Sequence, residues 1–135
     1  FGDSLTDANR ERGSSDAGRV VEEYSIQPRA YGSGFVFLAA THLFYEKPNY
    51  YQILNRGIGG DRLPQLYARI QLDVWNENPD VLSILIGVND VWHELGDSPN
   101  GVDADKFYKV YSMLLDEVFE SLPNIKIMIL YILHR

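Results

Sequence analysis

Apolar residues recur at helical spacing in three stretches of the chain. The first stretch predicts a helix from about Gly34 to Tyr45, which Pro48 ends. The second follows Asp61, which is placed to cap a helix, and it has Pro64 in the first turn, where a missing N–H is tolerated. The expected buried side of this second helix consists of Leu63, Leu66, Ile70 and Val74.

The third helical stretch is predicted to begin near Asp103 and to stop before Pro123. Its expected apolar stripe consists of Phe107, Val110, Tyr111, Leu114, Val118 and Leu122. The polar segment from Glu11 to Arg29 has no such periodicity, so we expect a loop there, with room for a short helix.

Three short apolar runs outside these helices predict β-strands. They are the run Tyr50–Asn55, which glycines close, the nearly continuous run Val81–Ile86, and the run Ile125–Leu133. Runs as apolar as the last two indicate strands buried on both faces of a parallel sheet. Strands and helices that alternate with short connections predict a three-layer α/β sandwich. We expect a single domain, residues 1–135, truncated at both ends relative to a complete sheet.

Charge and cysteine content exclude several classes of function. The 135 residues carry a formal net charge of −7 and no cysteine. Negative charge repels a phosphate backbone, so nucleic acid is not expected as a partner. Without cysteine there is no disulfide, no thiolate zinc site and no cysteine nucleophile. No apolar run is long enough to span a bilayer and no signal pattern opens the sequence, so we expect a cytoplasmic protein.

Three clusters of small and hydrogen-bonding residues stand where ligand-binding loops are expected. They are Gly2-Asp3-Ser4-Leu5-Thr6, Gly57-Ile58-Gly59-Gly60-Asp61 and Gly87-Val88-Asn89-Asp90. Open parallel sheets bind ligands beyond the carboxyl ends of their strands, so we expect all three clusters at one edge of the sheet. A dinucleotide motif fails as an explanation of the glycines, because the third glycine of G-x-G-x-x-G falls on Arg62.

These three motifs, in this order, resemble the first three blocks of the SGNH hydrolases, the GDSL-type esterases and lipases. The resemblance covers essentially the whole chain. It implies Ser4 as the nucleophile, Gly60 and Asn89 as oxyanion-hole residues, a flavodoxin-like sheet, and no cofactor or metal ion. The backbone N–H groups of Ser4 and Gly60 and the amide of Asn89 would then stabilise the negative oxygen formed in acyl transfer.

The family's fourth block is an Asp-x-x-His sequence near the C-terminus, and we expect this chain to lack any such sequence. His42 lies in a predicted helix, and we expect neither His93 nor His134 to replace the missing base. Asp61 and Asp90 are expected to be helix caps or loop braces. Two functions therefore stay open: an esterase, or a non-catalytic binding domain or inactive fragment that retains the oxyanion-binding residues.

The segments Asp7-Ala8-Asn9-Arg10 and Ile86–Trp92 further resemble bacterial carbohydrate acetylesterases. This resemblance favours a serine esterase that removes short acyl groups, chiefly acetyl, from a small-molecule or carbohydrate ester through an acyl-enzyme on Ser4. Asp3 and Trp92 are the candidate substrate-binding residues, Trp92 because it follows Asn89 near the mouth of the predicted site. The sequence does not define an oligomeric state.

Overall fold

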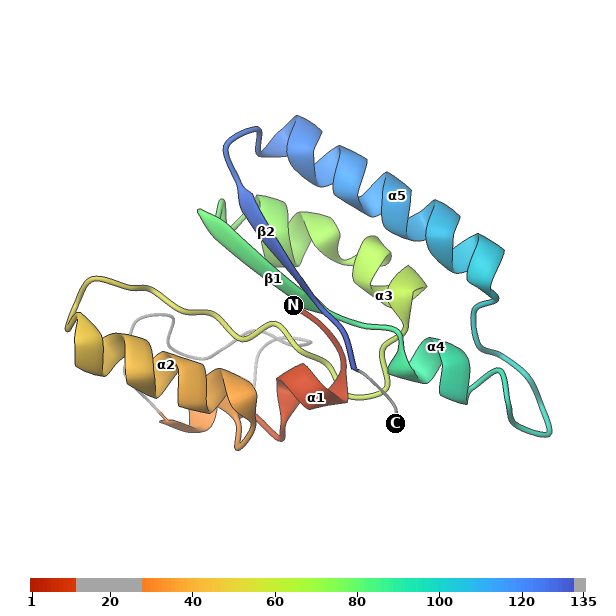
Figure 1. The fold of residues 1–135 in the computed structure, drawn as a ribbon, viewed down its shortest axis with the longest axis horizontal. Helices are drawn as coiled ribbons and strands as arrows, with labels where there is room; N and C mark the ends of the chain where they lie inside the picture. The colour runs from red at the N-terminus through yellow and green to blue at the C-terminus, as the bar shows by residue number, and fades with distance from the viewer. Residues whose placement is uncertain (12–27, 133–135) are drawn as a thin grey trace. The chain divides into compact units, whose positions relative to one another are not determined.

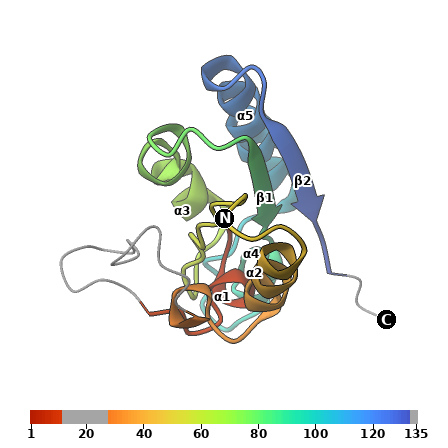
Figure 2. The ribbon, with the colours of Figure 1, turned by 90° about the vertical axis from the view of Figure 1, so that its left-hand side faces the viewer.

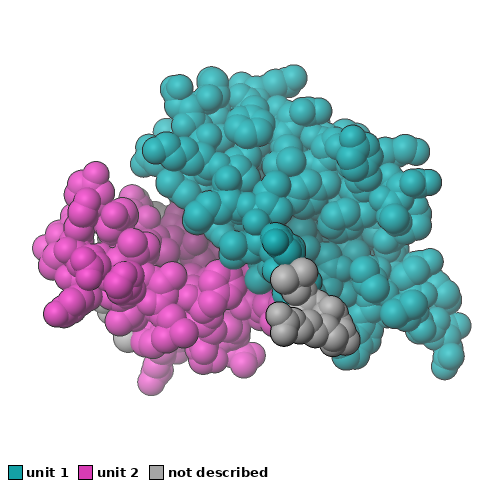
Figure 3. Space-filling model, viewed as in Figure 1, with its two compact units in different colours: residues 1, 60–135 teal, residues 2–59 magenta. Residues whose placement is uncertain are grey.

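The computed structural model describes residues 1–11 and 28–132, drawn as a ribbon in Figure 1 and Figure 2. The chain divides into two compact units, which Figure 3 colours separately. Unit 1 comprises Phe1 and residues 60–135, and unit 2 comprises residues 2–59. Most of the expected loop Glu11–Arg29 lies outside the described residues. None of the helices in the described part of the chain is long and apolar enough to cross a bilayer.

The sheet of unit 1 consists of two parallel strands, β1 (Val81–Leu85) and β2 (Lys126–Leu130), which lie side by side in Figure 2. Phe1 also hydrogen-bonds to β1. Its nitrogen donates to the carbonyl oxygen of Ser83 at 2.9 Å, and its carbonyl oxygen accepts from the N–H of Leu85 at 3.1 Å. The parallel sheet that the sequence predicts is therefore confirmed.

Helices α3 (Leu63–Ala68) and α5 (Ala104–Ser121) pack against each other in unit 1. A π-helical turn, Gln71–Trp75, continues α3, and the short helix α4 (Val88–Trp92) follows β1. Helix α5 begins where predicted, and Asp103 caps it, because the Asp103 side chain accepts the N–H of Lys106 at 3.0 Å. The second predicted helix is thus present as two shorter pieces, and the third is confirmed.

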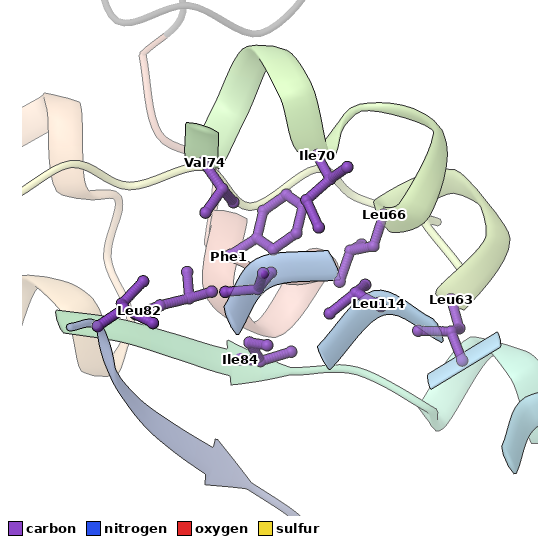
Figure 4. Close-up of a cluster of buried hydrophobic side chains, with 10 residues drawn as sticks. Phe1, Leu63, Leu66, Ile70, Val74, Leu82, Ile84 and Leu114 are labelled. Atoms are coloured by element: carbon purple, nitrogen blue, oxygen red, sulfur yellow. The ribbon is translucent and has the colours of Figure 1, made fainter. Parts of the chain in front are cut away.

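The hydrophobic core of unit 1 joins α3, the π-helical turn and α5 to the sheet (Figure 4). It consists of Phe1, Leu63, Leu66, Ile70, Val74, Leu82, Ile84, Leu114, Val118 and Ile125. All four residues of the second predicted stripe are among them. Full burial of a side chain of this size contributes about 1.5–3 kcal/mol. This apolar contact therefore fixes α3 beside β1, and the predicted site residue Gly60 lies three positions before α3.

Strand β2 is largely exposed, so the prediction of a strand buried on both faces is wrong for it. The exposed fraction is 52% for Met128 and 51% for Ile129. Within the described residues, β1 is the only strand that pairs with β2. Val81 of β1 is also half exposed. An apolar run indicates an apolar strand, but it does not indicate how much of that strand is covered.

Unit 2 contains α1 (Ser4–Asp7), a 3-10 turn (Pro28–Tyr31) and α2 (Phe35–Glu46). Helix α2 confirms the first predicted helix to within one residue at each end. The predicted strand Tyr50–Asn55 is wrong, because the segment is irregular and only Gly57, just beyond it, forms a β-bridge, with Gly2. A strand forms where its backbone groups hydrogen-bond to a neighbouring strand over several residues. Among the described residues, this part of the chain has only the single bridge between Gly57 and Gly2.

Candidate active site

Ser4 is the first residue of α1 in unit 2, and it is exposed. The side chain of Asp3 caps this helix by accepting the N–H of Leu5 at 3.0 Å. The helix ends at Ala8, whose backbone is left-handed with φ of 45°. A sharp turn into a short helix therefore presents Ser4 to solvent. Asp3, a predicted substrate-binding residue, is only 1% exposed and serves as this cap.

Three consecutive amides of the glycine loop are bonded within unit 2. The N–H of Gly57 donates to Asn55 Oδ1 at 2.9 Å, that of Ile58 to the Gly2 carbonyl oxygen at 3.0 Å, and that of Gly59 to Asp7 Oδ2 at 2.9 Å. The N–H of the next residue, Gly60, has no hydrogen-bond partner within the described residues. Gly60 therefore keeps a backbone donor that can bind a ligand.

Gly60 belongs to unit 1 and is exposed, and its φ of +86° lies in the left-handed region that favours glycine. Asn89, also in unit 1, lies in α4, and its Nδ2 donates to the carbonyl oxygen of Asp61 at 2.9 Å. This bond holds the Asn89 amide beside the residue that follows Gly60. Two of the three predicted catalytic positions are thus linked in unit 1, while Ser4 belongs to unit 2.

Asp90, rather than Asp61, braces the start of α3. Asp90 is 1% exposed, and its Oδ1 accepts the N–H of Leu63 at 2.9 Å. The carboxylate of Asp61 instead pairs with Arg69, whose Nε lies 2.8 Å from Oδ2. The prediction that Asp61 caps α3 is therefore wrong, because its side chain pairs with Arg69, the C-cap residue of α3, and its neighbour Arg62 occupies the N-cap position. The prediction that Asp90 is a loop brace is confirmed.

Two buried polar residues to which no sequence motif assigns a role, Asn55 and Arg10, hold the glycine loop to the α1 segment. Asn55 is 1% exposed, and its Nδ2 donates to the carbonyl oxygens of Thr6 and Tyr31 at 2.7 and 3.0 Å. Arg10 is 5% exposed, and its Nε donates to the carbonyl oxygen of Gly57 at 3.1 Å. Short sequence patterns do not distinguish buried polar residues from exposed ones. In the sequence, these two residues are marked only by their positions, each close to a glycine-containing motif.

Neither histidine of the described residues, His42 or His93, hydrogen-bonds to a carboxylate. His42 is exposed on α2, and His134 lies outside the described residues. Asp90 precedes His93 by three positions, so the expectation that the chain lacks any Asp-x-x-His sequence is wrong. The Asp90 carboxylate, however, accepts the N–H of Leu63, and His93 Nδ1 lies 3.0 Å from Asn100 Oδ1.

Trp92 ends α4 three residues after Asn89 and is 74% exposed, which leaves its ring open to a ligand. No group of three or more His, Asp or Glu side chains that could hold a metal ion is present within residues 1–11 and 28–132.

The whole chain, residues 1–135, matches the model of the GDSL-like lipase/acylhydrolase family, and the protein belongs to that family. Acetylxylan esterase from Geobacillus stearothermophilus is 33% identical over 132 residues, which are 96% of this chain and 56% of that enzyme. The chain therefore spans about half the length of this relative.

Solved structures of the family share the fold. A crystal structure solved as that of a GDSL-like lipase from Parabacteroides merdae is 38% identical, with a TM-score of 0.82 over 95% of this chain and 55% of the other. The structure of Axe2, the Geobacillus acetylxylan esterase, is 33% identical, with a TM-score of 0.76 over 95% of this chain and 55% of the other. The predicted α/β sandwich with a parallel sheet is thereby confirmed.

Three further Axe2 structures are of catalytic mutants, in which a serine, an aspartate or a histidine is replaced by alanine. The aspartate and the histidine lie three positions apart in that enzyme. Axe2 therefore has the aspartate–histidine spacing that the family resemblance leads us to expect near the C-terminus.

Proposed function

We propose that this chain supplies the nucleophile and the oxyanion-binding residues of a serine esterase that hydrolyses short acyl esters. The observation that carries the proposal is the glycine loop, in which three consecutive amides are bonded internally and the next, that of Gly60, has no partner within the described residues. An unpaired N–H on a glycine is suited to bind the oxygen that becomes negative during acyl transfer.

In the proposed reaction, Ser4 Oγ attacks the ester carbonyl carbon and its proton passes to a base. The carbonyl oxygen becomes an oxyanion, which the N–H groups of Ser4 and Gly60 and the amide of Asn89 stabilise. The alcohol then leaves, an acyl-enzyme forms on Ser4, and water hydrolyses it to release the acid. Asn89 can serve as a donor while bonded to Asp61, because a primary amide carries two N–H bonds.

We propose that the base is a histidine paired with an aspartate three positions before it, as the mutants of Axe2 indicate for that enzyme. We assign no histidine among these 135 residues to the role. The complete reading frame provides the first test: a second Asp-x-x-His sequence beyond residue 135 is expected. If the reading frame contains no such sequence, the esterase proposal loses its base and the binding-domain alternative becomes the better explanation.

Hydrolysis of p-nitrophenyl acetate provides the second test, with the protein made from its complete reading frame. The variant Ser4→Ala is expected to lose nearly all activity while keeping its fold, because Ser4 is exposed and its removal leaves no cavity. Equal rates for the two proteins would remove Ser4 from the mechanism. Ser33→Ala is a suitable control, since Ser33 is also an exposed serine of unit 2.

We propose an acetylated carbohydrate as the substrate. Two observations support it: the acetylxylan esterase relative, and the exposed indole of Trp92 three residues beyond Asn89. Aromatic faces pack well against the apolar faces of sugar rings. Trp92→Ala is therefore expected to raise KM for an acetylated xylo-oligosaccharide and to change KM for p-nitrophenyl acetate little. A parallel change for both esters would contradict a sugar-binding role for Trp92.

A further inference from the structure

Asp7 in unit 2 has a buried carboxylate that takes no part in the proposed reaction. Asp7 is the last residue of α1, three positions after Ser4, and it is 7% exposed. Its Oδ2 accepts the N–H of Gly59 at 2.9 Å. Because Gly59 directly precedes Gly60, this bond fixes the loop one residue before the proposed oxyanion donor.

The Gly59 end of the loop lies close to the nucleophile. A Cβ atom added to Gly59 would lie 3.5 Å from Asp7 Oδ2 and 3.8 Å from the Cβ of Ser4. The bond from Asp7 therefore ties the loop to the segment that carries Ser4. Glycines restrict the backbone little, so a loop with glycines at 57, 59 and 60 needs such external bonds to keep one conformation.

The buried carboxylate of Asp7 has a charged neighbour, the guanidinium group of Arg10. Arg10 Nε lies 3.8 Å from Asp7 Oδ1 and also donates to the carbonyl oxygen of Gly57. The guanidinium group compensates the buried carboxylate, and the same side chain bonds the loop two residues before Gly59. A hydrogen bond to a carboxylate is also stronger than one to a neutral oxygen.

We propose that Asp7 is a positioning residue for acyl transfer. By accepting the N–H of Gly59, it fixes the peptide that leads into Gly60, so that the N–H of Gly60 is held ready for the oxyanion. Asp7 touches no substrate atom and exchanges no proton in this role. The inference rests on the proposed function of Ser4 and Gly60, and it adds a residue that acts through the loop.

The test compares kcat and KM for p-nitrophenyl acetate in the protein made from its complete reading frame. Asp7→Ala is expected to lower kcat by about 10-fold to 100-fold and to change KM by less than about 3-fold, because a displaced donor weakens the transition state more than the substrate complex. Asp7→Asn keeps an acceptor oxygen and is expected to lose less activity than Asp7→Ala.

Asp103→Ala is the matched control. Asp103 is likewise an aspartate that accepts a backbone N–H, that of Lys106, but it caps α5 in unit 1. Its replacement is expected to lower thermal stability and leave kcat unchanged. Amide hydrogen exchange provides a direct structural readout: exchange of the Gly59 N–H should accelerate in Asp7→Ala and not in Asp103→Ala.

The outcomes separate the inference from the function on which it rests. If Ser4→Ala abolishes hydrolysis but Asp7→Ala leaves kcat within about 2-fold of the unmodified protein, Asp7 is not a positioning residue and the esterase stands. If Ser4→Ala is fully active, the proposed function itself is wrong. If Asp7→Ala does not fold, Asp7→Asn decides: an unchanged kcat together with rapid exchange at Gly59 overturns the inference.

Discussion

At the scale of single residues, Gly60 combines an unusual backbone with an open environment. Its φ is +86°, and no atom lies within 4 Å of the position that a Cβ would occupy. Gly60→Ala is therefore expected to cost about 1 kcal/mol of stability from backbone strain alone, without a steric clash. Activity is expected to fall as well, because relaxation of the strain turns the N–H away from its present direction.

The control for Gly60→Ala is Gly96→Ala. Gly96 also has no atom within 4 Å of the added Cβ, but it does not share the left-handed backbone. Thermal denaturation should show a loss for Gly60→Ala and little or no loss for Gly96→Ala. Equal effects at the two positions would mean that the backbone of Gly60 is not restrictive.

In the proposed oxyanion hole Asn89 contributes its side chain rather than its backbone, so replacement by alanine tests the role directly. Loss of one oxyanion donor typically lowers turnover by about 100-fold to 1000-fold. We expect a loss in this range for Asn89→Ala, measured as kcat for p-nitrophenyl acetate. Asn124→Ala, at an exposed position after α5, should be fully active. A loss below 10-fold for Asn89→Ala would contradict a role for Asn89 in the oxyanion hole.

Ser4, Gly60 and Asn89 could be proposed as site residues from sequence because each belongs to a short motif that directly follows a predicted element or opens the chain. The supporting residues could not be predicted in the same way. Asp7 and Asn55 lie 48 positions apart in sequence, and only the folded chain shows that both contact the loop 57–59. Long-range partners of a buried polar group leave no local pattern.

At the scale of elements, the start of α3 depends on a carboxylate from a distant segment. Asp90 is 27 positions from Leu63 and accepts its N–H within the buried interior. Asp90→Ala leaves that N–H without a partner and is expected to cost about 1–3 kcal/mol. Asp103→Ala, which removes an exposed cap, is expected to cost about 1 kcal/mol. Urea denaturation should rank the two variants in this order, and the reverse order would contradict the role of Asp90.

Helix α5 contains a second testable group, the phenol of Tyr111. Burial raises the pKa of Tyr111 to about 12, and its ring stacks on Phe107 with ring centroids 5.6 Å apart. The folded chain holds the phenol proton of Tyr111 more tightly than the unfolded chain does. The protonated phenol therefore contributes to the free energy of unfolding, and this contribution is complete below the ordinary pKa of about 10. It is lost as pH rises from there through about 12.

Tyr111→Phe removes this ionisation, so its melting temperature should fall less steeply with pH over that alkaline range. Tyr108→Phe is the control, since Tyr108 lies on the same helix and is 74% exposed. Melting temperatures of the three proteins measured from neutral to strongly alkaline pH test this expectation. Parallel curves for the unmodified protein and Tyr111→Phe would show that Tyr111 does not govern alkaline unfolding.

Helix periodicity predicted α5 well, because one side of that helix packs on the core of unit 1. It also predicted α2, although Ala40 is the one buried residue of that helix. It failed where burial depends on neighbours that no local pattern encodes. The segment Tyr50–Asn55 has the composition of a strand but lacks a partner of sufficient length among the described residues. Asp61 precedes α3 as a cap should, yet Arg69 binds its carboxylate.

At the scale of the whole molecule, the main feature is apolar surface along β2 and the residues after it. Ile129 is 51% exposed, Tyr131 is 75% exposed and Ile132 is 53% exposed. A strand with an unpaired edge and exposed apolar side chains is a site for association between chains. The 135-residue chain expressed alone is therefore expected to self-associate.

Sedimentation or light scattering at micromolar concentrations measures this association. The double variant Met128→Glu with Ile132→Lys places one charge on β2 and one on the residues after it, and it should shift the chain toward monomer. Leu95→Lys is the control, because Leu95 is 81% exposed but belongs to the loop after α4 and not to the strand or the residues that follow it. If the unmodified chain is monomeric and unfolds cooperatively, the exposed surface of β2 is not an association site.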